Sequence, residues 1–413
     1  MRLILALAAV LLAGPAMAQS DRQQAVAWCM GRGGTVETMI AGCSWLIRSE
    51  PATPDERAAA LLVRSTALWS LNDRDAAIAD MSEAIRLDPT NVKAVISRGN
   101  ARLVLGDLGG AIADHSEAIR LDPKADEAFS GRGMARSKRG DQAGAFADLN
   151  EAIRLNPKRS DALLIRGTLR ASQGDRDGGI ADYSEAIRLG PMRADAHMAR
   201  GVTRNRQGDH TGAIADLSAA IRLDPRLVDA YIARGVARSD MGDLAGATAD
   251  FAEATYLDNW NAAAFAHRGN GRRAQGDLPA ALTDYDTALR IEPRQPIALA
   301  DRCVLRRRLD QRGPAKADCD AAIAAAPPMV AWPYAARAGV ALLDGRNGAA
   351  MPDLAEALRR DPESRHALAL RAILRQRRGD ASGSAADAAA ARRLNPRVGA
   401  EINAIFGEAL VLR

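Results

Sequence analysis

The chain has 413 residues, with 56 Lys and Arg against 51 Asp and Glu, so its formal net charge is +5. Hydrophobic residues make up 47% and charged residues 26%, a balance that excludes intrinsically disordered and membrane-embedded classes. Aromatic residues are only 4% of the chain, which favours tightly packed helices over β-sandwiches and barrels, whose strands are rich in aromatic and β-branched residues.

Residues 1–18 have the features of a secretory signal peptide. Arg2 provides a positive start, residues 3–13 form an apolar run, and the Ala-Met-Ala of residues 16–18 is a small-x-small cleavage site. The apolar run is shorter than the roughly 20 residues that span a bilayer. We therefore expect cleavage before Gln19 and an exported protein, periplasmic or secreted, with no stable membrane insertion after cleavage.

The four cysteines form two local pairs. Cys29 and Cys43 are 14 residues apart, and Cys303 and Cys319 are 16 apart. In an oxidising compartment this spacing favours two disulfides, and the alternative is buried free thiols, which pack as small apolar side chains. Because neither pair has CxxC spacing or a nearby histidine, we expect no metal site and no cofactor.

A repeat of 34 residues runs through most of the chain. Its units end in proline at a regular spacing, except that the proline is missing at Asn259 and one unit has 35 residues. The recurring prolines are Pro89, Pro123, Pro157, Pro191, Pro225, Pro293, Pro327, Pro362 and Pro396. About ten units therefore run from Ala58 to Pro396, and the chain is expected to be one all-α solenoid of helix-turn-helix repeats.

Each unit is expected to form two antiparallel helices. In the second unit, apolar residues at helical spacing predict helices over residues 92–105 and 108–121. The Gly-Asp pair at 106–107 suits a left-handed helix end followed by a capping carboxylate. Because facing residues of a hairpin have a constant index sum, Gly99 is expected to face residues 111–115. Small residues then lie where the two backbones approach most closely.

This pattern resembles the tetratricopeptide repeat family, in its exported bacterial form. The hallmark positions are occupied by Gly99, Ala111, Ala118 and Pro123 in one unit and by Gly133, Ala145, Ala152 and Pro157 in the next. The resemblance covers residues 58–396 and implies a right-handed superhelix whose concave groove, lined by the first helix of each unit, binds proteins or peptides. It also implies a capping helical hairpin over residues 19–57 and a capping helix within residues 397–413.

One arginine and one aspartate occur in every unit, in fixed register. They are Arg64, Arg98, Arg132, Arg166, Arg200, Arg234, Arg268, Arg302, Arg337 and Arg371, and Asp80, Asp114, Asp148, Asp182, Asp216, Asp250, Asp284, Asp318, Asp353 and Asp387. Hairpin register places Arg98 opposite Asp114. We expect a structural ion pair, because partly buried charges require partners. The alternative is an arginine stripe that captures an acidic ligand.

A second arginine follows the first by four residues, or about one helical turn, in most units. This second stripe consists of Arg102, Arg136, Arg170, Arg204, Arg238, Arg272, Arg306 and Arg375. No further acidic residue recurs in all units to match it, although the capping aspartates of the Asp107 type and the glutamates of the Glu117 type could do so. If these guanidinium groups are free, they are candidates for binding anions, and the alternative is a solvated or ion-paired face.

The resemblance also indicates which residues face the groove. They are Ile96, Ser130, Leu164, Met198 and Ile232, then one turn further Asn100, Met134, Thr168, Val202 and Val236, and in the later units Arg273, Arg307 and Arg308. This groove is apolar to mildly polar and then basic, which suits an extended or helical partner segment with apolar anchors. The alternative is that some of these residues belong to the core between repeats.

The sequence contains no motif for catalysis. Its five histidines lie at different repeat positions, and it has neither a phosphate-binding loop nor a complete dinucleotide-binding glycine motif. Nucleic acid is not an expected partner, because acids alternate with bases and the charge after signal removal is 55 minus 51, or +4.

The sequence therefore predicts an exported, non-enzymatic scaffold that binds a protein or peptide partner in its groove. Two alternatives remain open. The first is a binder of acidic glycan or envelope polymer through the arginine stripes. The second is a repeat module that assists an enzyme in trans.

Overall fold

The structure, a computed structural model, describes residues 19–50, 52–407 and 410–412. The expected signal peptide, residues 1–18, lies outside them. The described residues form 23 helices and no strand, which confirms the all-α class. None of these helices combines the length and the apolar character needed to cross a bilayer. The chain divides into two compact units, residues 1–169 and residues 170–413.

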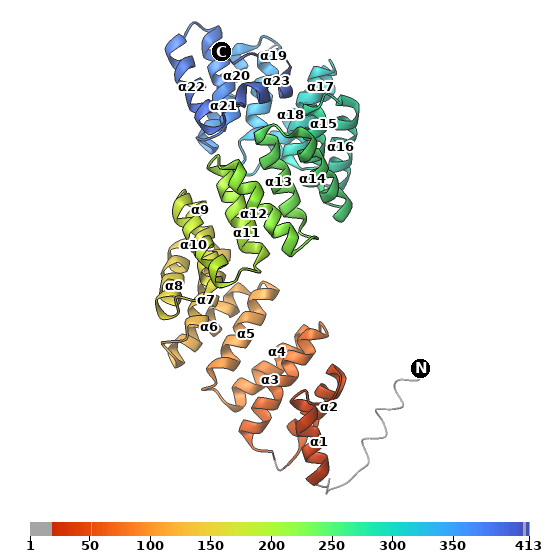
Figure 1. Cartoon of the computed structure of the whole chain (residues 1–413), viewed down its shortest axis with the longest axis vertical. Helices are drawn as coiled ribbons and strands as arrows, with labels where there is room; N and C mark the ends of the chain where they lie inside the picture. Colours follow the sequence, from red (N-terminus) through yellow and green to blue (C-terminus); the bar gives the residue numbers. More distant parts are fainter. Residues whose placement is uncertain (1–18, 51, 408–409, 413) are drawn as a thin grey trace, which may run out of the picture. The chain divides into compact units, whose positions relative to one another are not determined.

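Unit 1 is a row of antiparallel helices in which each helix packs against the next (Figure 1). Its helices are α1 (Gln19–Cys29), α2 (Val36–Arg48), α3 (Pro54–Ser70), α4 (Arg74–Leu87), α5 (Val92–Leu105), α6 (Leu108–Leu121), α7 (Asp126–Arg139), α8 (Gln142–Leu155) and most of α9 (Ser160–Ser172). The unit boundary falls inside α9.

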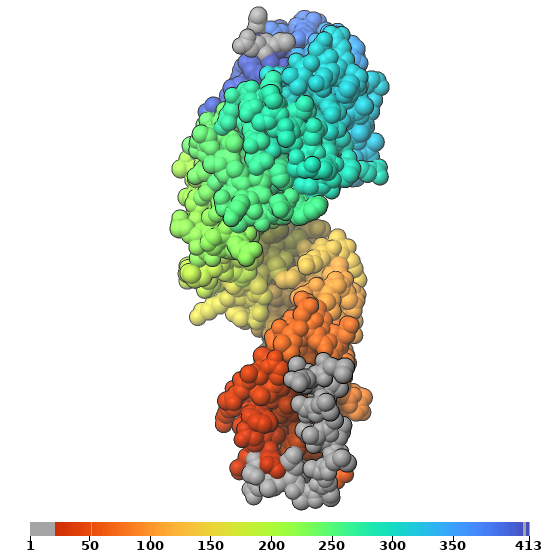
Figure 2. All heavy atoms as spheres, turned by 90° about the vertical axis from the view of Figure 1, so that its right-hand side faces the viewer, coloured from red at the N-terminus to blue at the C-terminus, as the bar shows by residue number. Residues whose placement is uncertain are grey.

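Unit 2 continues the same hairpin pattern and adds one helix at its end. It contains α10 (Arg176–Leu189), α11 (Ala194–Arg206), α12 (His210–Leu223), α13 (Val228–Met241), α14 (Leu244–Leu257), α15 (Ala262–Ala274), α16 (Leu278–Ile291), α17 (Pro296–Arg308), α18 (Arg312–Ala325), α19 (Trp332–Leu343), α20 (Asn347–Arg360), α21 (Arg365–Arg377), α22 (Ala381–Leu394) and α23 (Val398–Phe406). In Figure 2, the side chains of its green and teal hairpins meet in a continuous surface.

The ends of α5 and α6 show why the repeat folds as a hairpin. Asn91 caps α5 by accepting a hydrogen bond from the backbone N–H of Ala94. Gly106 ends that helix with φ +83°, a left-handed conformation that costs glycine little. Asp107 Oδ1 then accepts from the backbone N–H of Gly110 at 2.9 Å and starts α6. These contacts confirm the predicted turn.

Small residues let the two helices of a hairpin approach closely. In the hairpin of α7 and α8, Ala145 and Ala152 are fully buried. Leu149 packs over Gly133, where a Cβ would lie only 2.9 Å from the Leu149 Cγ. A large side chain placed over a glycine fills the hairpin without many aromatic residues. This packing explains the low aromatic content.

Both predicted disulfides are present. Cys29–Cys43 joins α1 to α2, with Cα atoms 4.6 Å apart, and Cys303–Cys319 joins α17 to α18, with Cα atoms 5.3 Å apart. In the repeat register, Cys303 stands where other hairpins have the close-contact glycine, and Cys319 stands where they have the large side chain. The second disulfide therefore takes the place of a packing contact.

Candidate binding site

The repeated arginine and aspartate form a bidentate ion pair across the hairpin. Arg98 Nε and Nη2 of α5 donate to the two carboxylate oxygens of Asp114 in α6, at 3.0 and 2.7 Å. The Asp114 side chain is only 6% exposed, so water cannot solvate its carboxylate. The Arg98 guanidinium compensates the buried negative charge instead. Arg98 Nη1 also donates to Ser82 Oγ in α4 at 3.2 Å, which joins this hairpin to the one before it.

The same bidentate geometry recurs along the chain. It joins Arg64 to Asp80, Arg132 to Asp148, Arg200 to Asp216, Arg234 to Asp250, Arg268 to Asp284, Arg302 to Asp318, Arg337 to Asp353 and Arg371 to Asp387. Arg166 and Asp182 belong to different units. Within its own unit, Arg166 Nη1 donates to Asn150 Oδ1 at 2.8 Å.

The second arginine stripe shares the aspartates of the first. Arg102 Nη1 lies 2.8 Å from Asp114 Oδ2, an oxygen that Arg98 Nε also contacts. Contacts of 2.7–3.0 Å join Arg136 to Asp148, Arg170 to Asp182, Arg204 to Asp216, Arg238 to Asp250, Arg272 to Asp284, Arg306 to Asp318 and Arg375 to Asp387. The stripe is therefore ion-paired rather than free. In most units the second arginine also lies 3.6–3.8 Å from the aspartate that caps the following helix, as Arg102 Nε does from Asp107 Oδ2.

The predicted groove residues differ in how far they reach the surface. Ile96 and Ser130 are buried, and Asn100 Nδ2 donates to Glu127 Oε1 at 3.2 Å. Thr168 is exposed. The partly exposed members are Met134, Leu164, Met198, Val202, Ile232 and Val236. Several of these also pack against the repeat core, so only part of the predicted set offers surface to a ligand.

The three predicted groove arginines of the later units have different surroundings. Arg307 pairs with Asp344, which ends α19. Arg308 Nη1 donates to the backbone carbonyl of Ala404 in α23 at 2.7 Å. Arg273 is 7% exposed and lines a cavity. The structure thus brings Arg273 and Arg308 toward α23 and directs Arg307 to a neighbouring turn.

The last helix, α23, packs against the first helices α15, α17, α19 and α21. Its buried apolar residues are Val398, Ile402, Ile405 and Phe406. The Phe406 ring lies on Gly339 of α19, where a Cβ would be 2.2 Å from the ring, and its centroid is 6.3 Å from that of Trp332. The first-helix side of unit 2 therefore holds a short apolar helix of the same chain.

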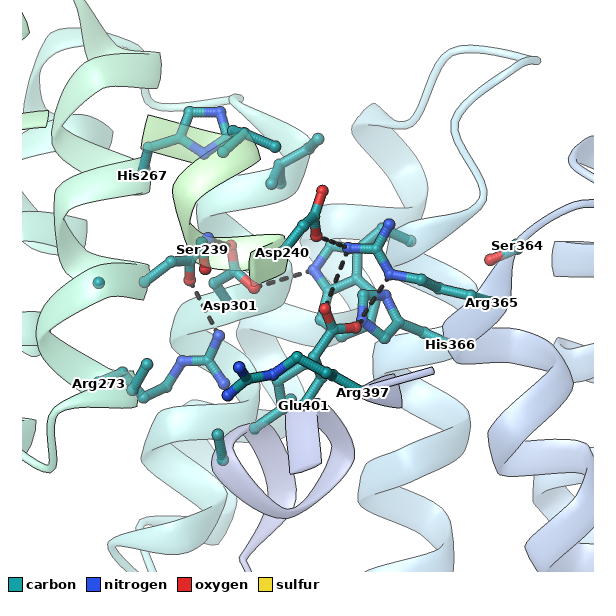
Figure 3. Close-up of a pocket in the computed structure, with 18 of the residues that line it drawn as sticks. Ser239, Asp240, His267, Arg273, Asp301, Ser364, Arg365, His366, Arg397 and Glu401 are labelled. Atoms are coloured by element: carbon teal, nitrogen blue, oxygen red, sulfur yellow. Dashed lines mark hydrogen bonds and ion pairs between the residues drawn. The ribbon is translucent and has the colours of Figure 1, made fainter. Parts of the chain in front are cut away.

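A cavity of about 600 Å³ opens beside α23 (Figure 3). It is lined by residues of α13, α15, α17, α19, α21 and α23. Its apolar wall includes Val236, Ile297, Val330, Ala404 and Ile405. The volume suits a small organic molecule or a few side chains.

Glu401 of α23 is the centre of an ionic network at this cavity. Its carboxylate lies 2.9 Å from Arg365 Nε and 2.9 Å from His366 Nε2, and Asn395 Nδ2 donates to it at 2.8 Å. Arg365 Nη2 also reaches Asp240 Oδ1 at 2.7 Å, so Arg365 lies between the two carboxylates (Figure 3). Burial alone would raise the pKa of Glu401, but His366 and Arg365 lower it to about 2.

Arg273 forms a second polar group at the cavity. Its Nε donates to Tyr285 Oη at 3.2 Å and its Nη2 to Asn270 Oδ1 at 3.1 Å, whereas Nη1 has no partner among the described residues. Asp301 accepts from Asn270 Nδ2 at 3.0 Å and from Trp332 Nε1 at 2.9 Å, and burial raises the pKa of Asp301. Arg273 is therefore a buried cation with neutral hydrogen-bond partners.

Most residues of this cavity were not predicted from the sequence. Several of them differ in type from the residues that other units have at the same repeat position. Asp240 stands where the α5 repeat has Val104, and Asp301 stands where the α7 repeat has Gly131. An acidic residue at a first-helix position that is apolar or small in most other units is the signal that would have found Asp301. In the described part of the chain, no His, Cys, Asp and Glu cluster has the arrangement of metal ligands.

Several solved structures are similar in part. A tetratricopeptide repeat protein from Parabacteroides merdae ATCC 43184 is 20% identical, with 58% of this chain and 95% of that chain covered and a TM-score of 0.46. Yeast Tom70 is 16% identical, with 84% and 87% covered and a TM-score of 0.43. The pilF protein of Pseudomonas aeruginosa is 17% identical, with 48% and 90% covered and a TM-score of 0.43.

A family model described as tetratricopeptide repeat matches residues 62–126, 96–160 and 164–228. Comparison with curated proteins finds no significant match. Because the TM-scores above are below 0.5, the family assignment rests on this match and on the regular 34-residue hairpins. Residues 62–160 and 164–228 of this chain therefore belong to the tetratricopeptide repeat family.

Proposed function

We propose that this protein is an exported, non-enzymatic scaffold that binds a segment of a partner protein along its first helices. Tetratricopeptide repeat proteins generally act as interaction scaffolds for proteins or peptides. The observation that carries the proposal is the position of α23, which packs against α15, α17, α19 and α21. The chain itself supplies an example of a helix held on this face.

The contacts of α23 indicate what this face can recognise. Its buried residues Val398, Ile402 and Phe406 are spaced four apart, so they form one apolar stripe. Arg308 holds a backbone carbonyl of the helix, and Arg365 holds its Glu401. A partner helix with an apolar stripe and an acidic residue would use the same type of contact.

The first helices α11 and α13 extend this face within unit 2, since α11 packs on α13 and α13 on α15. They present Met198, Val202 and Ile232, which are only partly buried. The flexible Met198 side chain can adapt to apolar anchors of a ligand. The β-branched Val202 and Ile232 add stiffer apolar surface beside it. We place the partner segment here.

Export is supported by the two disulfides, because disulfides persist in oxidising compartments and are rare in the cytosol. The signal-peptide pattern of residues 1–18 points the same way. We therefore propose a periplasmic or secreted location.

Site-specific photo-crosslinking in the producing cells tests this function. A photoreactive amino acid at Val202 should crosslink one defined partner protein, whereas the same amino acid at the exposed Arg222 of α12 should not. Val202→Glu should abolish partner capture while leaving the helical circular dichroism unchanged. Identical crosslinks from both positions, or none from Val202, would contradict groove binding.

Salt dependence separates this function from the polymer-binding alternative. An acidic glycan held by the arginines should dissociate between low and moderate salt, since the Debye length falls to about 10 Å at 0.1 M. A partner held by apolar anchors should stay bound. The identity of the crosslinked protein shows whether the scaffold serves an enzyme in trans.

A further inference from the structure

The cavity beside α23 is bordered by guanidinium groups that no carboxylate of the described residues pairs with. Arg273 donates only to neutral oxygens and keeps Nη1 unpartnered. Arg397 lines the same cavity and donates to the backbone carbonyl of Met241 at 2.6 Å. Arg308, beside it, donates to the carbonyl of Ala404. The cavity beside α23 is thus bordered by positive charges that no carboxylate of the described residues pairs with.

The carboxylates that line the cavity, in contrast, already have partners. Asp361 accepts from the backbone N–H of Glu363, and Glu363 pairs with Arg176. Asp240 holds Arg365 and also accepts from Asn205 Nδ2 at 3.1 Å. Glu401 has three donors, and Asp301 has two. A cationic ligand would have to break these contacts, whereas an anionic ligand would find an unused donor on Arg273. The cavity therefore favours an anion.

Much of the remaining lining is apolar, and this part of the cavity would contact the rest of the ligand. Val236, Ile297, Val330 and Ile405 form the wall around the polar groups, in a space of about 600 Å³. A planar guanidinium suits a carboxylate, which accepts two parallel hydrogen bonds. We propose that this cavity binds a small organic acid with an apolar body, whose carboxylate meets Arg273. This site goes beyond the proposed protein-binding function and does not depend on it.

Calorimetric titration of the full chain with three probes of equal length tests the site. Octanoate carries the expected carboxylate, octanol has the same body without charge, and octylammonium has the opposite charge. We expect octanoate to bind at least tenfold more tightly than octanol, and octylammonium not to bind. Equal affinity for octanoate and octanol, no octanoate binding, or tighter octylammonium binding would overturn the proposal.

Two variants locate the interaction. Arg273→Met keeps the apolar stem and removes the charge, so octanoate affinity should fall at least tenfold while octanol affinity stays the same. Arg222→Met removes one exposed charge on α12 and is the matched control, which should leave both affinities unchanged. Unchanged octanoate binding by Arg273→Met would show that the acid binds elsewhere.

A cavity-filling variant keeps the test decisive if the buried Arg273 proves necessary for folding. Ala274→Trp places an indole in the cavity lining and leaves Arg273 in place. Thermal unfolding confirms that this variant is folded, and its octanoate binding should then be lost. Retained binding in the filled cavity would exclude the site.

Discussion

At the scale of single residues, the shared aspartate is the main polar element of the repeat. Asp148 is 4% exposed in its side chain and holds Arg132 and Arg136 at 2.7 Å each. Hairpin register predicts which arginine faces which aspartate, because helix geometry fixes the facing positions. The sequence could not predict that one carboxylate pairs with two arginines, because this pairing depends on the orientation of long side chains.

Replacing this aspartate should destabilise the array. In Asp148→Ala, two partly buried guanidinium groups lose their partner, and breaking a buried pair costs about 3 kcal/mol. Chemical denaturation of the variant measures this loss. The matched control is Glu151→Gln in the same helix, whose exposed pair with Arg154 should contribute little. Equal effects of both substitutions would contradict a structural role for the shared aspartate.

His115 should make the stability of unit 1 dependent on pH. Its ring is fully buried beside Gly99 and Gly131, and neither ring nitrogen has a hydrogen-bond partner among the residues that the structure describes. Burial lowers the pKa of His115 to about 4. The unfolded chain, with an ordinary histidine pKa near 6.5, binds the proton more readily, so stability falls as pH drops from about 6.5 toward 4.

His115→Leu should remove this loss and raise stability at pH 4.5 by about 2 kcal/mol relative to wild type, with a smaller gain at pH 8. Denaturation midpoints at both pH values measure the difference. Leu149→His, at the same position of the next hairpin, should introduce a similar pH dependence. A pH-independent effect of His115→Leu would show that the histidine does not titrate on unfolding.

At the scale of elements, the hairpins were predictable and the position of α23 was not. The helices of the second unit were predicted over residues 92–105 and 108–121, the bounds that α5 and α6 have. Each of these helices packs on neighbours in the chain, so local signals suffice. α23 instead packs against helices as distant as α15, and its apolar stripe alone does not indicate which surface it covers.

Gly339 should control the docking of α23. A side chain at this position meets the Phe406 ring, so Gly339→Leu should push the helix away at a cost of about 1–3 kcal/mol. Hydrogen exchange of residues 398–406 should become faster in this variant. Gly348→Leu, where a Cβ has open space, is the control and should leave exchange in α23 unchanged. Unaltered exchange in Gly339→Leu would contradict the packing.

At the scale of the whole molecule, repetition accounts for what the sequence could predict. The 34-residue period, the small residues and the two cysteine pairs predicted the fold class and the disulfides, because these features recur or lie close together. The cavity includes residues whose type does not recur at their repeat position, such as Asp240 and Asp301. A repeat pattern describes the average unit, so it cannot show that residues which differ from that average line one cavity.

The link from Arg98 back to Ser82 also bears on how such a chain can grow or shrink. In most units the first arginine contacts an aspartate 16 residues ahead and a partner 16 residues behind, so duplicating or deleting such a 34-residue unit preserves these contacts. The 35-residue unit shows how an odd insertion is absorbed. Arg337 keeps Asp353 16 residues ahead, but reaches back 17 residues to Asp320. Gene duplication could thus change the number of repeats without redesigning a single contact.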